Sequence, residues 1–308
     1  MARCSGARPP GEGGRGVAFR VGCVADPPRK VVALDAEGVG EEPVAEHQLR
    51  GTEGLGASRG LREELDALYD ASLAREVHPG KHAQPDELDS GGGLFLGIIA
   101  DIKRRKFEIF DKLALSDEAP IRPERVISTL MKVLPADATV VSDPGTSCPY
   151  FSAYYQLPQA GRHFITNRAH GALGYSLSAS LGAWYGRPAS KTVALMGDGS
   201  FGFTVGELET VCRARAPITF VVFSNASFGW IKASQQADKD ARYYNVDFGR
   251  TDQAAIAAAY GVKSWRVEDP ADLDRVLAQA VAHNGPSLVD VICQPLEDTA
   301  APVRRWMG

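Results

Sequence analysis

The sequence predicts a doubly wound α/β domain with a mainly parallel sheet and helices on both faces over residues 115–308. Two observations support this fold class. From residue 115 onward, short apolar runs of strand length alternate with amphipathic helical stretches, which is typical of consecutive βαβ units. Two of these runs end in polar or glycine-rich loops, as strands do at the carboxyl edge of a parallel sheet. Residues 1–114 show no such alternation and are expected to be a low-order region, apart from a leucine-rich helix at Ser58–Arg75.

The elements of the domain are expected in the following order. Pro123 and Glu124 open a helix that Pro135 ends, and a strand at Ala138–Val141 runs into the polar segment Asp143–Ser147. The remaining elements are a small-residue helix at Ser176–Trp184, strands at Val193–Met196 and Ile218–Phe223, an irregular cap from Phe228 to Phe248, helices at Gln253–Tyr260 and Ala271–His283, and strands at Lys263–Val267 and Ser287–Cys293. Thr204, followed three residues later by Glu207, predicts the start of a helix between the two central strands.

Composition limits the classes of partner. The 308 residues are 44% hydrophobic, and 34 Lys+Arg against 38 Asp+Glu leave a charge of -4, so no nucleic-acid partner is expected. The five cysteines have no C-x-x-C spacing, and a reducing cytoplasm is the default location. The apolar run Leu94–Ala100 is too short to span a bilayer, so no membrane partner is expected.

Two polar positions follow the two central strands. Asp198 lies in the turn Gly197–Gly199, and Asn225 follows the next strand, so a parallel sheet brings both residues to the same edge. Backbone N–H groups at a glycine turn that opens a helix suit a phosphate, but an adjacent carboxylate repels it unless a cation lies between them. Mg²⁺ prefers oxygen ligands of this kind. The pattern therefore favours a magnesium-bridged diphosphate site.

A dinucleotide site is the competing interpretation. The segment Gly197–Gly202 also fits G-x-G-x-x-G between a strand and a helix. A nicotinamide site would carry an acidic residue at the end of the next strand, where this chain has Ser224 and Asn225. A nicotinamide-binding oxidoreductase is therefore the remote alternative, and the sequence gives no separate indication of FAD.

The pairing of GDGSF with NASFGW resembles the diphosphate-binding signature of the thiamine diphosphate enzymes, in the branch that contains acetolactate synthase and benzoylformate decarboxylase. The resemblance covers about residues 115–308 and implies thiamine diphosphate and Mg²⁺ as cofactors. It assigns the metal to Asp198, Asn225 and the carbonyl of Ser227. It assigns cofactor contacts to Gly197, Gly199, Ser200 and Phe228.

Two further segments enter through the same resemblance. The loop that holds Thr146 and Ser147 is expected to contact the diphosphate, although hydroxyls in a Pro-Gly turn commonly serve the turn itself. Gly171, Ala172 and Leu173 fall in the segment that meets the aminopyrimidine ring. The resemblance implies that Leu173 lies under the cofactor and holds its two rings in a V, while on sequence alone a leucine between glycines also fits an ordinary core position.

One half of the expected active site has no counterpart in this sequence. Enzymes of this type use a second α/β domain, whose glutamate contacts the pyrimidine ring, and residues 1–114 contain neither. They resemble at most a remnant of the family's central domain. No catalytic residue is assigned.

The resemblance therefore implies an acetolactate synthase-like 2-oxoacid carboligase or decarboxylase component. It would act on a small 2-oxoacid, with a pyrimidine-domain subunit, a homo-oligomer or both. A truncated, non-catalytic cofactor-binding module is the alternative.

Overall fold

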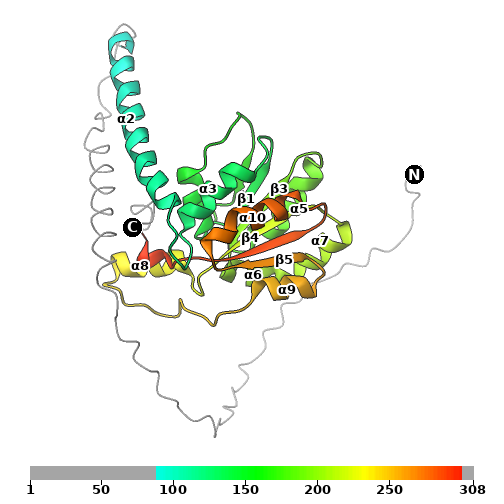
Figure 1. Cartoon of the computed structure of the whole chain (residues 1–308). Coiled ribbons are helices and arrows are strands. Elements are labelled where there is room, and N and C mark those ends of the chain that lie inside the picture. Colours follow the sequence, from blue (N-terminus) through cyan, green and yellow to red (C-terminus); the bar gives the residue numbers. More distant parts are fainter. Residues whose placement is uncertain (1–87, 300–308) are drawn as a thin grey trace, which may run out of the picture. The chain divides into compact units, whose positions relative to one another are not determined.

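A computed structural model of the chain describes residues 88–299 and contains a six-stranded parallel sheet (Figure 1). The strands occur in space in the order β2-β1-β3-β4-β6-β5, and every neighbouring pair is parallel. Their bounds are β1 Thr139–Ser142, β2 Phe164–Thr166, β3 Thr192–Gly197, β4 Thr219–Ser224, β5 Lys263–Val267 and β6 Ser287–Ile292. The predicted parallel α/β class is confirmed.

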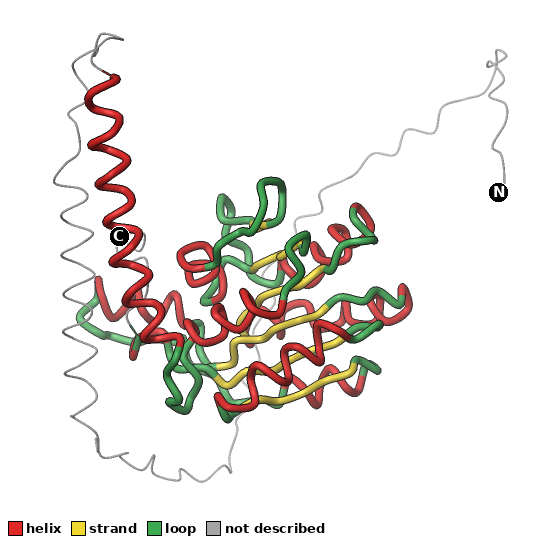
Figure 2. Tube along the Cα trace, turned by 45° about the horizontal axis from the view of Figure 1, so that its top comes forward, coloured by secondary structure: helices red, strands yellow, loops and turns green. Residues whose placement is uncertain are grey.

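Helices connect the strands and cover both faces of the sheet (Figure 2). The α-helices are α2 Leu88–Ala114, α3 Pro123–Val133, α4 Ser147–Tyr154, α5 Tyr175–Gly186, α6 Asp198–Thr204, α7 Leu208–Ala214, α8 Gly229–Asp238, α9 Gln253–Ala259 and α10 Pro270–Ala282. Two 3₁₀ turns, η2 Val205–Glu207 and η3 Leu296–Asp298, complete the described elements. None of the helices within residues 88–299 combines the length and apolarity needed to cross a bilayer.

Alternation along the strands builds two apolar layers. On β3, Val193 and Leu195 pack in one cluster together with residues of α3, α4 and α10. The intervening Ala194 and Met196 pack in the other cluster, with residues of α5, α6, α7 and α9. Because successive side chains of a strand point to opposite faces, a strand that is buried on both faces is apolar over most of its length. Each fully buried side chain of the Val or Leu type contributes roughly 1.5–3 kcal/mol.

The strand order places the site. The chain passes from β1 to β2 on one side and then returns to β3 on the other side of β1. Ligands of open α/β sheets bind outside the carboxyl ends of the strands at such a reversal, where two loops leave in opposite directions. The β1 and β3 loops are the segments that the sequence indicated, Asp143–Ser147 and Gly197–Gly199.

The predicted start of the helix after β3 was wrong. α6 begins at Asp198, directly after the strand, and Thr204 is its last residue. The Thr204 hydroxyl does not cap a helix but donates to the carbonyl of Gly174, 3.1 Å away. The glycines of the turn obscured this helix, because glycine has a low helix propensity.

Three other helices, α2, α4 and α8, were not predicted, and neither was the strand β2. α2 lies on the N-terminal side of residue 115, and its last turns bury Phe110 and Ala114 in the apolar layer of α3. α8 occupies the first part of the segment that was expected to be an irregular cap. The helix predicted at Ser58–Arg75 lies outside the described residues.

Glu124, in the first turn of α3, is a fully buried carboxyl group. Neither of its side-chain oxygens has a hydrogen-bond partner among the described residues. Burial raises its pKa from 4.5 to about 7, and the nearby Arg122 opposes this shift only in part. Burial raises the pKa values of Tyr150 and Tyr154, and a charge on Glu124 raises both of them further. The neutral acid is therefore the form that suits this position.

We expect Glu124 to make the folded domain less stable as the pH rises. The folded state retains the proton up to about pH 7, whereas the unfolded chain releases it near pH 4.5. The free energy of unfolding should therefore fall by roughly 3 kcal/mol between these pH values and remain lower above them. Glu124→Gln should remove most of this slope in urea unfolding measured from pH 5 to pH 8. Glu209→Gln, at an exposed position of α7, is the control, and an unchanged slope in Glu124→Gln would contradict the assignment.

Candidate functional site

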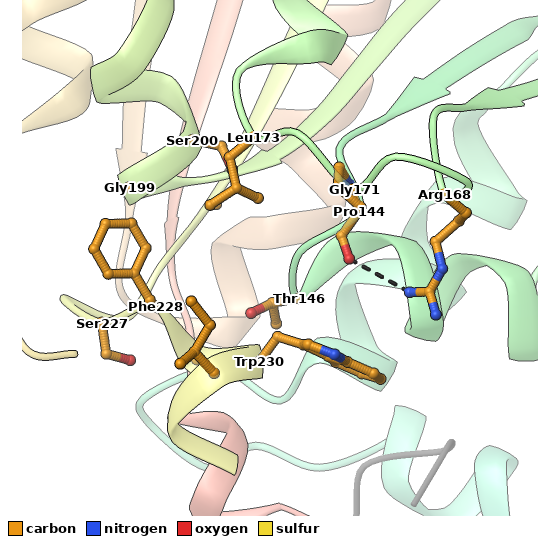
Figure 3. A pocket seen from close by; sticks show the side chains of 13 residues that line it. Pro144, Thr146, Arg168, Gly171, Leu173, Gly199, Ser200, Ser227, Phe228 and Trp230 are labelled. Carbon is orange, nitrogen blue, oxygen red and sulfur yellow. Dashed lines mark hydrogen bonds between the residues drawn. The ribbon is translucent and has the colours of Figure 1, made fainter. Parts of the chain in front are cut away.

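A pocket of about 270 Å³ opens at the carboxyl edge of the sheet (Figure 3). Loops that follow four neighbouring strands, β1, β2, β3 and β4, form its walls, and the first turn of α8 closes one side. The lining residues are Pro144, Thr146, Arg168, Gly171, Leu173, Gly197, Gly199, Ser200, Ser227, Phe228, Gly229, Trp230 and Ile231. Eight of the twelve site residues predicted from the sequence are among them.

Asp198 ties the β3 turn to the β4 loop. Its Oδ1 accepts from the N–H of Gly199 at 2.9 Å, and its Oδ2 accepts from the N–H groups of Asn225 at 3.0 Å and Ala226 at 2.7 Å. The side chain is 6% exposed, and burial raises its pKa to about 6 although the three N–H groups favour the charged form. The predicted closeness of Asp198 and Asn225 is thus present, with the carboxylate as the connecting group.

The loop after β4 has an unusual backbone. Ala226 adopts a left-handed conformation with φ 57°, which costs a non-glycine residue roughly 1–2 kcal/mol. This turn allows Asn225 Oδ1 to accept from the N–H of Ser227 at 3.2 Å and from its hydroxyl at 3.3 Å. Asn225 Nδ2 is buried without a hydrogen-bond partner among the described residues. The loop therefore holds one unsatisfied polar group beside the pocket.

Two glycines allow the close approach of the loops. A Cβ on Gly199 would lie 2.7 Å from the ring of Phe228, so only glycine lets the β3 turn pack against that aromatic. A Cβ on Gly229 would lie 3.0 Å from Thr146 Oγ1 and 3.1 Å from Asn225 Nδ2. Glycine at both positions keeps backbone and polar atoms accessible at the pocket wall.

The two predicted hydroxyl groups in the loop after β1 have different surroundings. Thr146 lines the pocket, whereas Ser147 is fully buried and its hydroxyl lies 3.0 Å from that of Ser142. Asp143 is also buried, and its carboxylate accepts from the N–H groups of Tyr175 and Ser176 at 2.8 and 3.3 Å. The sequence did not predict this role. The Asp143 carboxylate fixes the start of α5 beside the pocket, although burial raises its pKa.

The loop after β2 approaches from the other side. Gly171 and Leu173 line the pocket, while Ala172 does not and uses its carbonyl to accept from Asn167 Nδ2 at 2.9 Å. Gly171 has φ 76°, which favours glycine. Leu173 is half-buried at the pocket wall rather than in either apolar layer.

Two lining residues with large side chains, Arg168 and Ile231, were not predicted, and Trp230 was expected only as part of an irregular cap over the site. Nothing in the spacing of the motifs distinguishes Arg168 from an ordinary loop arginine. Trp230 and Ile231 enter the wall because α8 begins at Gly229, and the helix itself was missed.

An ion-pair cluster attaches α8 to its surroundings. The ammonium of Lys232 lies 2.7 Å from Asp247 Oδ1 and 2.6 Å from Glu297 Oε1. Asp247 belongs to the segment that pairs with the β4 loop, since it forms an antiparallel bridge with Ser227. Lys232 therefore connects α8, the β4 loop and the 3₁₀ turn η3.

A second, smaller cavity of about 70 Å³ lies on another side of Asp198 and Asn225. Both residues line this cavity and not the larger pocket, together with Arg250 and Arg266. No group of three or more His, Cys, Asp or Glu that could hold a metal occurs among the side chains that the structure describes. The predicted metal ligands include one carboxylate, one amide and one backbone carbonyl.

Comparison with known families shows what the domain is similar to. The family described as "Thiamine pyrophosphate enzyme, C-terminal TPP binding domain" matches residues 143–291, which include all four pocket loops. The chain is 34% identical over 194 residues to acetolactate synthase of Bacillus subtilis, covering 63% of this chain and 34% of that enzyme. It is 28% identical over 185 residues to benzoylformate decarboxylase of Pseudomonas aeruginosa, covering 60% and 35%.

The fold agrees with a solved structure of the same kind. The thiamine diphosphate-dependent 4-hydroxybenzoylformate decarboxylase of Rhodococcus jostii superposes with a TM-score of 0.55 at 22% identity, covering 59% of this chain and 34% of the other. The chain spans about a third of the length of the curated relatives it matches. Residues 143–291 therefore match the C-terminal TPP-binding domain of thiamine pyrophosphate enzymes in sequence, and the described fold is similar to that of such an enzyme.

Proposed function

We propose that this domain binds thiamine diphosphate together with Mg²⁺ and supplies the diphosphate half of the active site of a 2-oxoacid carboligase or decarboxylase. The observation that carries the proposal is the junction at Asp198. The Asp198 carboxylate holds the glycine turn that starts α6 against the loop after β4. That loop contains the unsatisfied amide of Asn225. The junction lies at the edge of the parallel sheet where the strand order reverses.

The residues present fit such a cofactor. The N–H of Ser200, in the first turn of α6, suits a phosphate oxygen because a helix start carries a partial positive charge, whereas the N–H of Gly199 already donates to Asp198. Asn225 has a buried Nδ2 without a partner among the described residues, and a half-turn of its amide would present Oδ1 there instead, while breaking the two hydrogen bonds that Oδ1 accepts from Ser227. With the Asp198 carboxylate and the Ser227 carbonyl, this supplies the hard oxygen ligands that Mg²⁺ prefers. Thr146 offers a further hydroxyl to the pocket.

The bound cofactor would supply a carbanion-stabilising centre for the attack on a 2-oxoacid carbonyl. The chain's own residues have simpler roles. The glycine turn and Asn225 bind and orient the diphosphate, Leu173 supports the rings from below, and Phe228 limits the access of water. No described residue is assigned the proton transfer, which requires a second domain.

We further propose that a partner subunit supplies this second domain. Large apolar side chains surround the mouth of the pocket and remain exposed, with Phe203 at 63% and Ile231 at 49%. Phe203 lies parallel to Phe228, with 6.1 Å between the ring centroids, so the patch is continuous with the pocket wall. Exposed apolar patches next to a site commonly mark an interface.

The metal proposal is tested by titrating thiamine diphosphate calorimetrically with saturating Mg²⁺ and with chelator. Asp198→Asn should weaken the Mg²⁺-dependent affinity about tenfold to hundredfold, because it removes a charge-assisted contact of roughly 1.5–3 kcal/mol. Asn225→Asp should retain affinity with Mg²⁺ but lose it in chelator, because two adjacent carboxylates repel the diphosphate unless a cation neutralises them.

The control for these variants is Asp137→Asn, at an exposed carboxylate that accepts from Ser190 before β1, at the opposite edge of the sheet. Because Asp198 also accepts three N–H groups, unfolding in urea should be measured in parallel to separate a disturbed loop from a lost ligand. Wild-type binding that is indifferent to chelator, or an Asn225→Asp variant that binds equally well in both conditions, would refute the metal-bridged site.

Association through the pocket mouth is tested by sedimentation velocity over a range of chain concentrations, with cofactor and Mg²⁺ present. Phe203→Asp should shift the chain toward the monomer, because burying a charge in the centre of an apolar interface is energetically unfavourable. Tyr185→Asp is the matched control, because Tyr185 is 64% exposed but lies at the far end of α5. Equal behaviour of the two variants would exclude this face as the interface.

A further inference from the structure

Arg168 places a positive charge in the pocket. It follows β2 on the loop that continues to Gly171 and Leu173, and it is half-buried. Of the described residues that line the pocket, it is the one with a charged side chain, while the others are glycines, hydroxyl-bearing residues or apolar residues. A charged group in such surroundings is an anion-recognition element rather than part of a solvated surface.

The guanidinium is held in a defined position. Its Nη1 donates to the carbonyl of Pro144 at 3.5 Å, and its central carbon lies 5.4 Å from the centroid of the Trp230 ring (Figure 3). Stacking on an aromatic face and a carbonyl partner both restrict the planar group, so less conformational entropy is lost when it binds an anion. Pro144 and Trp230 come from different walls, which fixes the guanidinium across the pocket.

The diphosphate is not the best candidate for this anion. Figure 3 shows Arg168 and Trp230 on one side of the pocket, with Phe228 on the other. The groups suited to a diphosphate are the α6 start at Gly199 and the Asp198–Asn225 junction. A divalent cation at that junction would already compensate the charge of the diphosphate. Among the described residues that line the pocket, Arg168 is the one cationic group that an organic acid could meet.

The carboxylate that a decarboxylation expels is also a poor match. Loss of CO₂ converts a localised anionic charge into a neutral product, and a fixed guanidinium would stabilise the charged ground state more than the transition state. A cation in this position is useful only for a carboxylate that is still present when the reaction is complete.

We infer that Arg168 binds a substrate carboxylate that the reaction retains. Two sources share this chemistry, namely the distal carboxylate of a dicarboxylic 2-oxoacid donor and the carboxylate of a 2-oxoacid acceptor. The inference rests on the proposed function and narrows its substrate class to acids that keep a negative charge. A bidentate guanidinium–carboxylate pair against the Trp230 ring would fix the orientation of that substrate.

The test uses Trp230 as a reporter on the intact chain, without cofactor. We would titrate 2-oxoglutarate and pyruvate at constant ionic strength, follow tryptophan emission, and assign the signal with Trp230→Phe. The neutral esters dimethyl 2-oxoglutarate and methyl pyruvate are the uncharged probes. The acids should bind, the esters should bind on the order of tenfold more weakly or not at all, and Arg168→Gln should weaken the acids by a similar factor.

Two variants separate charge from geometry. Arg168→Lys keeps the charge but loses the planar, bidentate fork, so its affinity for the acids should fall between those of wild type and Arg168→Gln. Arg213→Gln, at a guanidinium on α7 that is 69% exposed, should bind as the wild type does. Tighter binding of 2-oxoglutarate than of pyruvate assigns the distal carboxylate of a donor, and equal binding assigns an acceptor carboxylate.

Separate outcomes overturn the inference and the proposed function. Equal binding of acids and esters, or acid binding unchanged in Arg168→Gln, would overturn the carboxylate site. An Arg168→Gln variant that loses thiamine diphosphate affinity but keeps acid binding would assign Arg168 to the diphosphate instead, which also overturns it. Failure of the wild type to bind thiamine diphosphate refutes the proposed function, and the acid titration is measured independently of it.

Discussion

The hydrogen bonds from three backbone N–H groups to the Asp198 carboxylate are the interaction on which the site depends. The carboxylate joins the end of β3 to the end of β4 and fixes the left-handed turn at Ala226. Burying a carboxylate is unfavourable unless its oxygens are satisfied, and here backbone N–H groups that the turn itself exposes satisfy them. The charge is retained at the cost of a raised pKa. In this fold the two carboxylate oxygens of Asp198 hold the two loops together and, as proposed, also serve metal binding.

The sheet makes this junction possible. The parallel strands β1, β3 and β4 end at one edge, and the reversal between β1 and β3 leaves room for a ligand between their loops. A second buried carboxylate, Asp143, fixes α5 in a similar way from the β1 loop. Two aspartates at the ends of neighbouring strands thus hold the helix starts around the pocket. At Asp198 a neutral amide would leave at least one N–H donor unpaired, because both carboxylate oxygens accept from the backbone.

Much of this arrangement could be predicted from the sequence. The apolar runs at Val193–Met196 and Ile218–Phe223 identified the central strands, because strands buried on both faces are apolar over most of their length. Their spacing also placed Asp198 beside Asn225. The start of α6 could not be predicted, because glycines mask helical periodicity. Arg168 and the buried pairing of Ser147 depend on side-chain directions in loops, which no periodic pattern encodes. α8 was missed because its buried residues are only Gly229 and Ala233, which give no apolar periodicity of large side chains.

The walls of the pocket differ in how they are anchored. Three walls continue directly from strands of the sheet, so a change in their backbone would disturb the hydrogen-bonded ladder. The wall formed by α8 is attached instead through Ala233 and through the ion pairs of Lys232 with Asp247 and Glu297. Trp230 and Ile231 lie on this wall. Sequence changes in α8 can therefore alter the size and shape of the pocket on the Trp230 side, while the strands that hold the Asp198 junction stay unchanged.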